Sequence, residues 1–259
     1  MKIPIYQIDA FTDRRFHGNP AAVCILDNWL PDELMQDIAA ENNLSETAFV
    51  LPRNNNFELR WFTPVVEVDL CGHATLATAF VMKEHLHYEK DEIEFKTRSG
   101  LLKVIYGGNI MTMIFPRTPA KSCDITEQLL RGVGKQPVEV LKSRDYLVIL
   151  NNEDEVKKIE PDFNSLKLLN THGVIVTAQG NEVDFVSRFF APGEGIPEDP
   201  VTGSSHTTLI PYWSERLRKK EMVALQLSKR GGKLYCEDLG DSVKISGQAT
   251  TYLIGEITV

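Results

Sequence analysis

The chain has 259 residues, of which 42% are hydrophobic and 25% are charged, enough to bury one large core or two smaller ones. Its formal net charge is −8, and its sequence pI is about 5.3. Proteins that bind nucleic acids or anionic membrane surfaces need basic patches, so this charge argues against both kinds of partner.

The sequence carries no targeting or membrane-spanning signal. No apolar run reaches the roughly 20 residues that cross a bilayer, and the N-terminus enters a strand-like pattern without a signal peptide. We therefore expect a cytoplasmic protein. The cysteines are dispersed and form no C-x-x-C pair, so we expect reduced thiols and neither a zinc site nor a redox pair. They are Cys24, Cys71, Cys123 and Cys236.

Strands dominate the first half of the chain. They are expected at residues 4–10, 21–26, 45–51, 57–62, 93–97, 101–106 and 110–115. A helix with proline and acidic residues in its first turn is predicted at 30–41. In the strand at 45–51, alternation places Glu46 on the same face as Ala48 and Val50. A carboxylate among small apolar side chains is unusual, and this singles out Glu46.

A glycine turn and an almost entirely apolar helix are predicted at residues 71–86, and a helix without a polar face belongs inside a domain. A related pattern recurs at 198–210, where a second glycine turn leads into a helix at 205–220. The chain therefore looks built from two similar halves. If both helix N-termini faced one cleft, their free N–H groups would hold an anionic small molecule. The alternative is two buried helices with glycine-assisted starts.

The boundary between the halves is expected at residues 116–122, which contain two prolines and no periodicity. The N-terminal half is then 1–117, completed by the last strand at about 249–259, and the C-terminal half is 118–248. In the second half, a short helix is expected at 125–133. Strands are expected at 137–141, 146–150, 173–178, 183–190, 223–227, 233–236, 243–246 and 251–258. Neither half shows the strand–helix alternation of a doubly wound sheet.

The common dinucleotide, nucleotide, hydrolase and metalloprotease motifs are absent. Among the histidines, His73 stands out because it lies in the first turn of the helix after Gly72, where an imidazole could relay a proton. Local hydrogen bonds could equally account for it. His172 and His206 have no partner visible in the sequence.

Asp199 precedes Pro200, which favours an extended backbone just before the second glycine turn. Its carboxylate would then lie beside the start of the helix, although a solvated loop acid would also fit, as we expect for Glu194 and Glu198. Glu46, His73 and Asp199 come from three separate segments, as is usual for a site between two halves.

Seven segments together resemble the successive signatures of the PhzF-like phenazine-biosynthesis isomerase family, across nearly the whole chain. They are YQIDAF (6–11), GNPAAV (18–23), NLSETAF (43–49), RWFTP (60–64), CGHAT (71–75), FAP (190–192) and EDPVTGS (198–204). The resemblance implies an α+β, diaminopimelate-epimerase-like fold. In it, each of two similar halves wraps a barrel-like mixed or antiparallel sheet around a central helix, and the site lies between the halves.

The same resemblance implies that Glu46 is the acid/base group and that His73, Asp199 and Ser204 are polar groups around it. Ser45, Gly72, Gly203 and Ser204 are the expected substrate-binding positions. Family members use neither a metal nor an organic cofactor and are often homodimers, and we expect the same here. The expected function is a cofactor-independent isomerase acting on a small carboxylate-bearing molecule.

Two alternatives remain within this fold. Related amino-acid epimerases use one cysteine from each half, but only the first turn carries a thiol, Cys71, so a two-thiol mechanism is not expected. A non-catalytic binding protein of the same family is the second alternative. The physiological substrate does not follow from the sequence.

Overall fold

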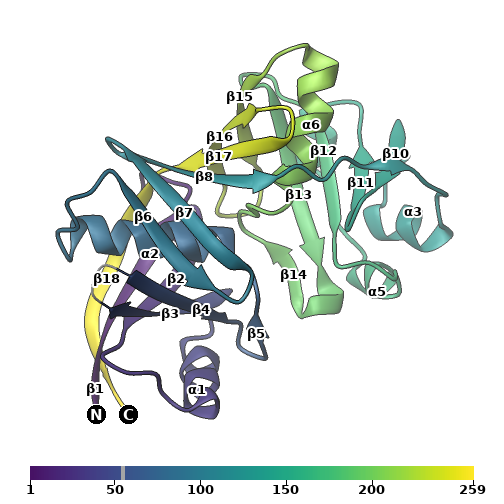
Figure 1. Ribbon diagram of the computed structural model, residues 1–259. Helices are drawn as coiled ribbons and strands as arrows, with labels where there is room; N and C mark the ends of the chain where they lie inside the picture. Colours follow the sequence, from purple (N-terminus) through teal and green to yellow (C-terminus); the bar gives the residue numbers. More distant parts are fainter. Residues whose placement is uncertain (54–55) are drawn as a thin grey trace. The chain divides into compact units, whose positions relative to one another are not determined.

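The computed structural model describes residues 1–53 and 56–259 (Figure 1). The chain divides into two compact units: unit 1 comprises Met1–Ile114 and Ser246–Val259, and unit 2 comprises Phe115–Ile245. No helix of the described residues is long and apolar enough to cross a membrane.

Unit 1 is a mixed sheet of successive strands with two helices. Its strands are β1 (Lys2–Ala10), β2 (Asn19–Ile25), β3 (Glu46–Arg53), β4 (Asn56–Phe62), β5 (Glu67–Val68), β6 (Glu92–Thr97), β7 (Gly100–Gly107) and β18 (Ala249–Thr258). Strand β8 (Ile110–Pro116) begins in unit 1 and ends in unit 2. β1 pairs antiparallel with both β2 and β18, whereas β2 pairs parallel with β3. The C-terminal strand therefore joins the N-terminal strand in one sheet.

The central helix of unit 1 is α2 (Gly72–Glu84), and nine of its residues are buried. It packs against β1, β2, β3 and β18, and the hydroxyl of Tyr106 on β7 donates to the carbonyl of Ala79 at 2.9 Å. The hydroxyls of Thr75 and Thr78 donate to carbonyls one turn earlier in the helix. Most of the helix can be buried because these two threonine hydroxyls are satisfied within the helix itself.

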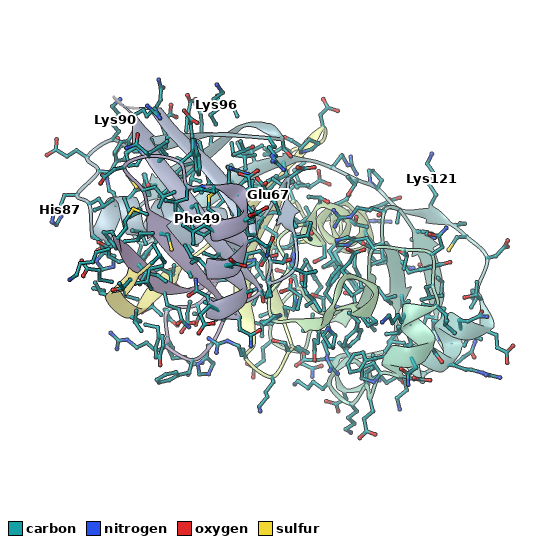
Figure 2. The ribbon with its side chains drawn as sticks, turned by 90° about the horizontal axis from the view of Figure 1, so that it is seen from below. Phe49, Glu67, His87, Lys90, Lys96 and Lys121 are labelled. Atoms are coloured by element: carbon teal, nitrogen blue, oxygen red, sulfur yellow. The ribbon has the colours of Figure 1, made fainter. Side chains whose placement is uncertain are left out.

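The other helix of unit 1, α1 (Asp32–Asn42), is amphipathic and buries Met35, Ile38 and Ala39. These residues join a core cluster with Phe49 on β3. Figure 2 shows Phe49 among the strands, whereas Lys90 and Lys96 lie at the periphery of the unit. All residues from Thr47 to Leu51 are buried. Both faces of β3 are therefore covered, and alternation does not separate an inner face from an outer one.

Unit 2 is also a mixed sheet. Its strands are β9 (Lys121–Ser122), β10 (Glu139–Lys142), β11 (Tyr146–Ile149), β12 (Val174–Gln179), β13 (Phe185–Ala191), β14 (Ile196–Asp199), β15 (Glu221–Gln226) and β16 (Gly232–Asp238). Strand β17 (Ser242–Gly247) begins in unit 2 and ends in unit 1. β11–β12 and β13–β15 are parallel pairs, whereas β12–β13 and β15–β16 are antiparallel.

The helices of unit 2 are α3 (Glu127–Val133), α4 (Glu153–Lys157), α5 (Phe163–Lys167), the 3₁₀ turn η1 (Pro192–Glu194) and α6 (His206–Leu217). The long helix α6 packs against β15 and β16. It is buried over its first two turns, where Trp213 Nε1 donates to Thr177 Oγ1 at 2.9 Å. It is exposed at Glu215 and Arg216. The burial expected for this helix therefore applies to its beginning and not to its end.

The segment expected as the linker, 116–122, ends in the short strand β9, which pairs with β10. One expectation for unit 2 is wrong. Glu198 is not a solvated loop acid: it lies on β14, its side chain is 21% exposed, and it forms a two-point ion pair with Arg188. Local periodicity does not predict this pair, because strand pairing brings the two residues together.

Candidate active site

The start of α2 is set by Cys71, which has an extended backbone (φ −143°, ψ 109°) and is the N-cap of the helix. The first backbone bond of the helix runs from Thr75 N to Cys71 O. The N–H groups before Thr75 therefore have no partner within the helix, as at every helix start. No Ser, Thr, Asp or Asn occupies the cap position, so this helix start can favour an anionic ligand.

Three side chains of unit 1 converge at this helix start, and we call them the Glu46 cluster (Glu46, Cys71 and His73). Nε2 of His73 lies 3.1 Å from Oε2 of Glu46, and its Nδ1 lies 3.5 Å from Sγ of Cys71. Parallel pairing of β2 with β3 places Glu46 opposite Ala21 at the beginning of its strand. The side chains of His73 and Glu46 are only 6% and 12% exposed.

The contact between Glu46 and His73 is close but does not meet hydrogen-bond geometry. Among the described residues, neither Glu46 Oε2 nor His73 Nε2 has another hydrogen-bond partner. A buried polar atom without a well-formed bond is costly. Catalytic contacts are often poorly aligned without ligand and tighten when one binds. The close but poorly aligned contact is therefore of the kind that can rearrange when a ligand binds.

The surroundings of Glu46 shift the pKa values of both His73 and Cys71, for different reasons. Burial alone would lower the pKa of His73, but Cys71 and the Glu46 carboxylate stabilise the imidazolium and raise that pKa well above its ordinary value. Burial and the nearby Glu46 charge raise the pKa of Cys71 to about 11. The thiol is therefore neutral at neutral pH, and the imidazole is biased toward its protonated form.

The cluster also has the composition of a metal site. Glu46, Cys71 and His73 each offer one donor atom, and these atoms all lie within 4.8 Å of one another. Ser45 and Gly72, the two substrate-binding positions expected beside the cluster, are both half-buried.

In unit 2, Asp199 lies at the end of β14, and its carboxylate organises the turn that leads into α6. Oδ2 of Asp199 accepts from the hydroxyl of Thr202 at 2.5 Å. Thr202 N donates to the side-chain carbonyl of Gln226 at 2.8 Å, and the Gln226 amide donates to Asp199 O at 2.8 Å. All three side chains are buried. Asp199 is thus a partnered acid within the fold and not a solvated one.

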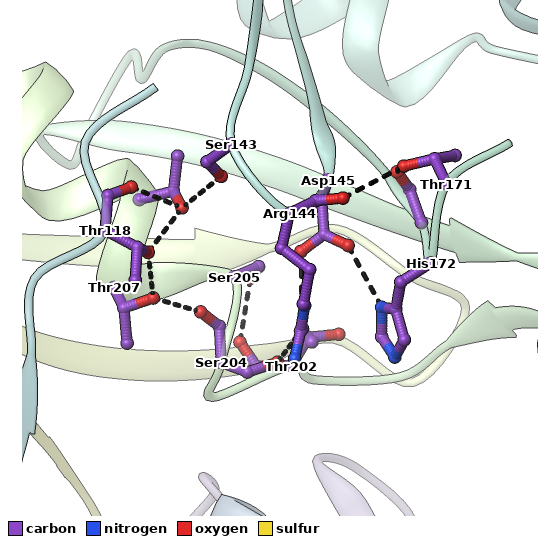
Figure 3. Close-up of polar contacts among 12 residues, drawn as sticks. Thr118, Ser143, Arg144, Asp145, Thr171, His172, Thr202, Ser204, Ser205 and Thr207 are labelled. Atoms are coloured by element: carbon purple, nitrogen blue, oxygen red, sulfur yellow. Dashed lines mark hydrogen bonds and ion pairs between the residues drawn. The ribbon is translucent and has the colours of Figure 1, made fainter. Parts of the chain in front are cut away.

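Ser204 follows this turn and contacts a charged cluster that no motif in the sequence marks (Figure 3). Arg144 Nη2 donates to Ser204 Oγ at 3.1 Å and lies 3.3 Å from Asp145 Oδ2. Nδ1 of His172 lies 3.0 Å from the other Asp145 oxygen. Burial would raise the pKa of Asp145, but His172 and Arg144 lower it. Asp145 and His172 are 27 residues apart, and no spacing rule connects them.

Gly203 is buried, and its carbonyl accepts from His206 N at 3.1 Å at the start of α6. His206 is also buried, and its Nδ1 contacts Thr202 O at 2.8 Å. The predicted site residues therefore form two groups. Glu46, His73, Ser45 and Gly72 lie around the start of α2, and Asp199, Gly203 and Ser204 lie around the start of α6.

Comparison with known proteins places the chain in a family. The model of the PhzC-PhzF family, described as phenazine biosynthesis-like protein, matches residues 8–255. An "uncharacterized isomerase" of Pseudomonas aeruginosa is 51% identical over 257 residues, which are 99% of each chain. The crystal structure of a PhzF-family phenazine biosynthesis protein from Enterococcus faecalis is 45% identical, covers 100% of both chains and superposes with a TM-score of 0.98.

The fold extends to epimerases. The crystal structure of a hydroxyproline epimerase from Agrobacterium vitis is only 10% identical but has a TM-score of 0.59 over 99% of this chain and 92% of that one. This similarity concerns the fold alone. Together with the PhzF-family match it confirms the α+β, diaminopimelate-epimerase-like class predicted from the sequence. The chain is therefore a member of the phenazine biosynthesis-like (PhzC-PhzF) protein family.

Proposed function

We propose that this protein is a cofactor-independent isomerase that moves a proton on a small carboxylate-bearing metabolite through Glu46. The observation that carries the proposal is the 3.1 Å approach of His73 Nε2 to the buried oxygen of Glu46 at the start of α2. The isomerase names of the curated relatives support the reaction class.

In the proposed step, Glu46 removes a proton from a carbon beside a conjugated system. The C–H electron pair becomes delocalised, and Glu46 returns the proton to a different carbon, so that a double bond changes place without net oxidation. The protonated imidazole of His73 steadies the carboxylate while Glu46 is charged. The N–H groups at the start of α2, near Gly72 and the half-buried Ser45, would bind negative charge on the substrate.

We propose supporting roles for the predicted residues of unit 2. Asp199 fixes the turn before α6 through Thr202, and its charge contributes to the reaction. Gly203 and Ser204 bind substrate at the start of that helix. Arg144 donates to the Ser204 hydroxyl and is half exposed. Its guanidinium can therefore turn from that hydroxyl to donate to a ligand carboxylate instead.

Two other functions fit the same fold less well. A two-cysteine epimerase would need a thiol in the turn before α6, where the side chains are those of Asp199 and Thr202. A non-catalytic binding protein would not need a buried carboxylate whose free oxygen faces an imidazole. The enzyme proposal accounts for that arrangement.

The test is a nuclear magnetic resonance screen of small unsaturated carboxylates in deuterated water. The proposal predicts that the wild-type protein incorporates deuterium into at least one compound and that Glu46→Gln does not. Binding without any exchange across the screen would favour the non-catalytic function. Exchange that survives Glu46→Gln but is lost in Cys71→Ala would favour thiol chemistry.

A further inference from the structure

We propose that the Glu46 cluster is also a binding site for a borderline-soft divalent cation, with Zn²⁺ as the best fit, and that this ion inhibits the enzyme. The ion is not a resident cofactor in this proposal. It competes with the proton-transfer function of the same side chains.

The geometry of the donors supports the site. Bond lengths of about 2.0 Å to nitrogen and oxygen and about 2.3 Å to sulfur place tetrahedral ligands roughly 3.5 Å apart. A single cation can take only one ring nitrogen of His73: Nε2 lies 3.1 Å from Glu46 Oε2, and Nδ1 lies 3.5 Å from Cys71 Sγ. With one donor atom from each residue, the three donors all lie within 4.8 Å of one another. In the proposed site they draw together by about 1 Å to reach tetrahedral spacing.

A second observation points to a ligand. Glu46 Oε2 and His73 Nε2 are buried and lie 3.1 Å apart, but neither atom makes a well-formed hydrogen bond within the residues that the structure describes. A coordinated cation would satisfy the carboxylate oxygen and one ring nitrogen together. The three protein ligands would leave a fourth position for water, as in three-ligand zinc sites.

The donor set also selects the ion. Thiolate and imidazole ligands suit Zn²⁺ and its substitutes, whereas Mg²⁺ and Ca²⁺ require oxygen ligands. On binding, Cys71 gives up its thiol proton and His73 gives up the proton of its coordinating nitrogen, and both protons go to solvent. No oxidation takes place, so the binding is reversible by a chelator.

Inhibition follows if Glu46 carries the proton, because a coordinated carboxylate cannot act as a base. This consequence rests on the proposed function, whereas ion binding does not. Chelator treatment should therefore raise the activity of zinc-exposed enzyme.

The experiment is a titration of the full-length protein with Co²⁺, followed by absorption and then by displacement with Zn²⁺. We expect one equivalent of Co²⁺ to produce a thiolate-to-cobalt charge-transfer band and the visible bands of a tetrahedral ion, and Zn²⁺ to abolish both. Cys71→Ser should lose the charge-transfer band, and His73→Gln should weaken binding by more than about 100-fold. Cys123→Ser is the matched control, because Cys123 is the one described cysteine that is not buried, and it should bind like the wild type.

The proposal is wrong if wild-type protein gives no charge-transfer band, or if Cys123→Ser removes the band while Cys71→Ser keeps it. His73→Gln keeps both the thiol and the carboxylate, so it remains decisive if Cys71→Ser fails to fold. The readout needs no substrate. A failed deuterium-exchange screen with a normal cobalt spectrum would reject the proposed reaction and leave the ion site standing.

Discussion

Nε2 of His73 lies 3.1 Å from Oε2 of Glu46, with both side chains almost removed from solvent. The carboxylate helps to hold the pKa of the imidazole well above its ordinary value despite burial. We predict that Glu46→Gln lowers the pKa of His73 measured by nuclear magnetic resonance titration of the ring nitrogens. Glu41→Gln alters an exposed acid nearby in the sequence and should leave that pKa in place. An unchanged His73 pKa in Glu46→Gln would show that the two groups are not coupled.

The buried His206 predicts a loss of stability in mild acid. Burial lowers its pKa to about 4 from an ordinary value of 6.5. The unfolded chain takes up a proton at this residue below about pH 6.5, whereas the folded chain resists until about pH 4. The free energy of unfolding should fall across this window by about 3 kcal/mol from His206 alone.

The measurement for His206 is urea unfolding from pH 7 to pH 4 of the wild type and of His206→Phe. The stability difference between them should change by about 3 kcal/mol in favour of the variant as the pH falls. His87→Asn alters an exposed histidine, and its difference from wild type should stay nearly constant. A constant difference for His206→Phe would contradict the burial argument.

The ion pair between Arg188 and Glu198 should stabilise unit 2. Arg188 is 11% exposed, bonds both Glu198 oxygens and also donates to the carbonyl of Ile159 at 2.8 Å. Arg188→Ala should lower the free energy of unfolding by about 3 kcal/mol, because it leaves the half-buried carboxylate of Glu198 without its ion-pair partner. The control is Arg131→Ala, which breaks an exposed pair with Glu127 and should cost less than about 0.5 kcal/mol. Equal losses in chemical denaturation would refute this ranking.

Asp199→Asn should lower the rate of substrate deuterium exchange, but by less than Glu46→Gln, because it removes a charge and not the transferring group. Thr202→Val separates two explanations, since it deletes the hydroxyl that donates to Asp199 and keeps the carboxylate. If the charge matters, Thr202→Val is the milder variant. If both variants lose activity equally, Asp199 acts only by holding the turn. If Asp199→Asn exchanges at the wild-type rate, neither the charge of Asp199 nor its hold on the turn contributes to the reaction.

Local patterns in the sequence predicted the parts of the site that lie close together in the chain. Cys71, Gly72 and His73 mark a buried helix start, and the burial of α2 follows from its lack of a polar face. The position of Glu46 beside His73 was implied by family resemblance, since alternation along β3 does not distinguish two covered faces.

Contacts made through the sheet could not be predicted in this way. Gln226 is fully buried and bonds both ends of the turn from Asp199 to Thr202, yet it is a single glutamine in an ordinary strand pattern. The Arg144–Asp145–His172 cluster depends on the parallel pairing of β11 with β12, which places Tyr146 opposite Val174. Single-sequence periodicity gives the existence of these strands but not their partners.

In the proposed reaction, Glu46 carries the proton. The decisive measurement is the rate of substrate deuterium exchange in Glu46→Gln and Cys71→Ala, with folding checked by thermal unfolding. Glutamine keeps the size of the side chain but cannot carry the proton, so the rate should fall by about 10²–10⁴-fold, whereas Cys71→Ala should have a far smaller effect. Wild-type exchange in Glu46→Gln together with an inactive Cys71→Ala would contradict the account and assign the proton transfer to the thiol.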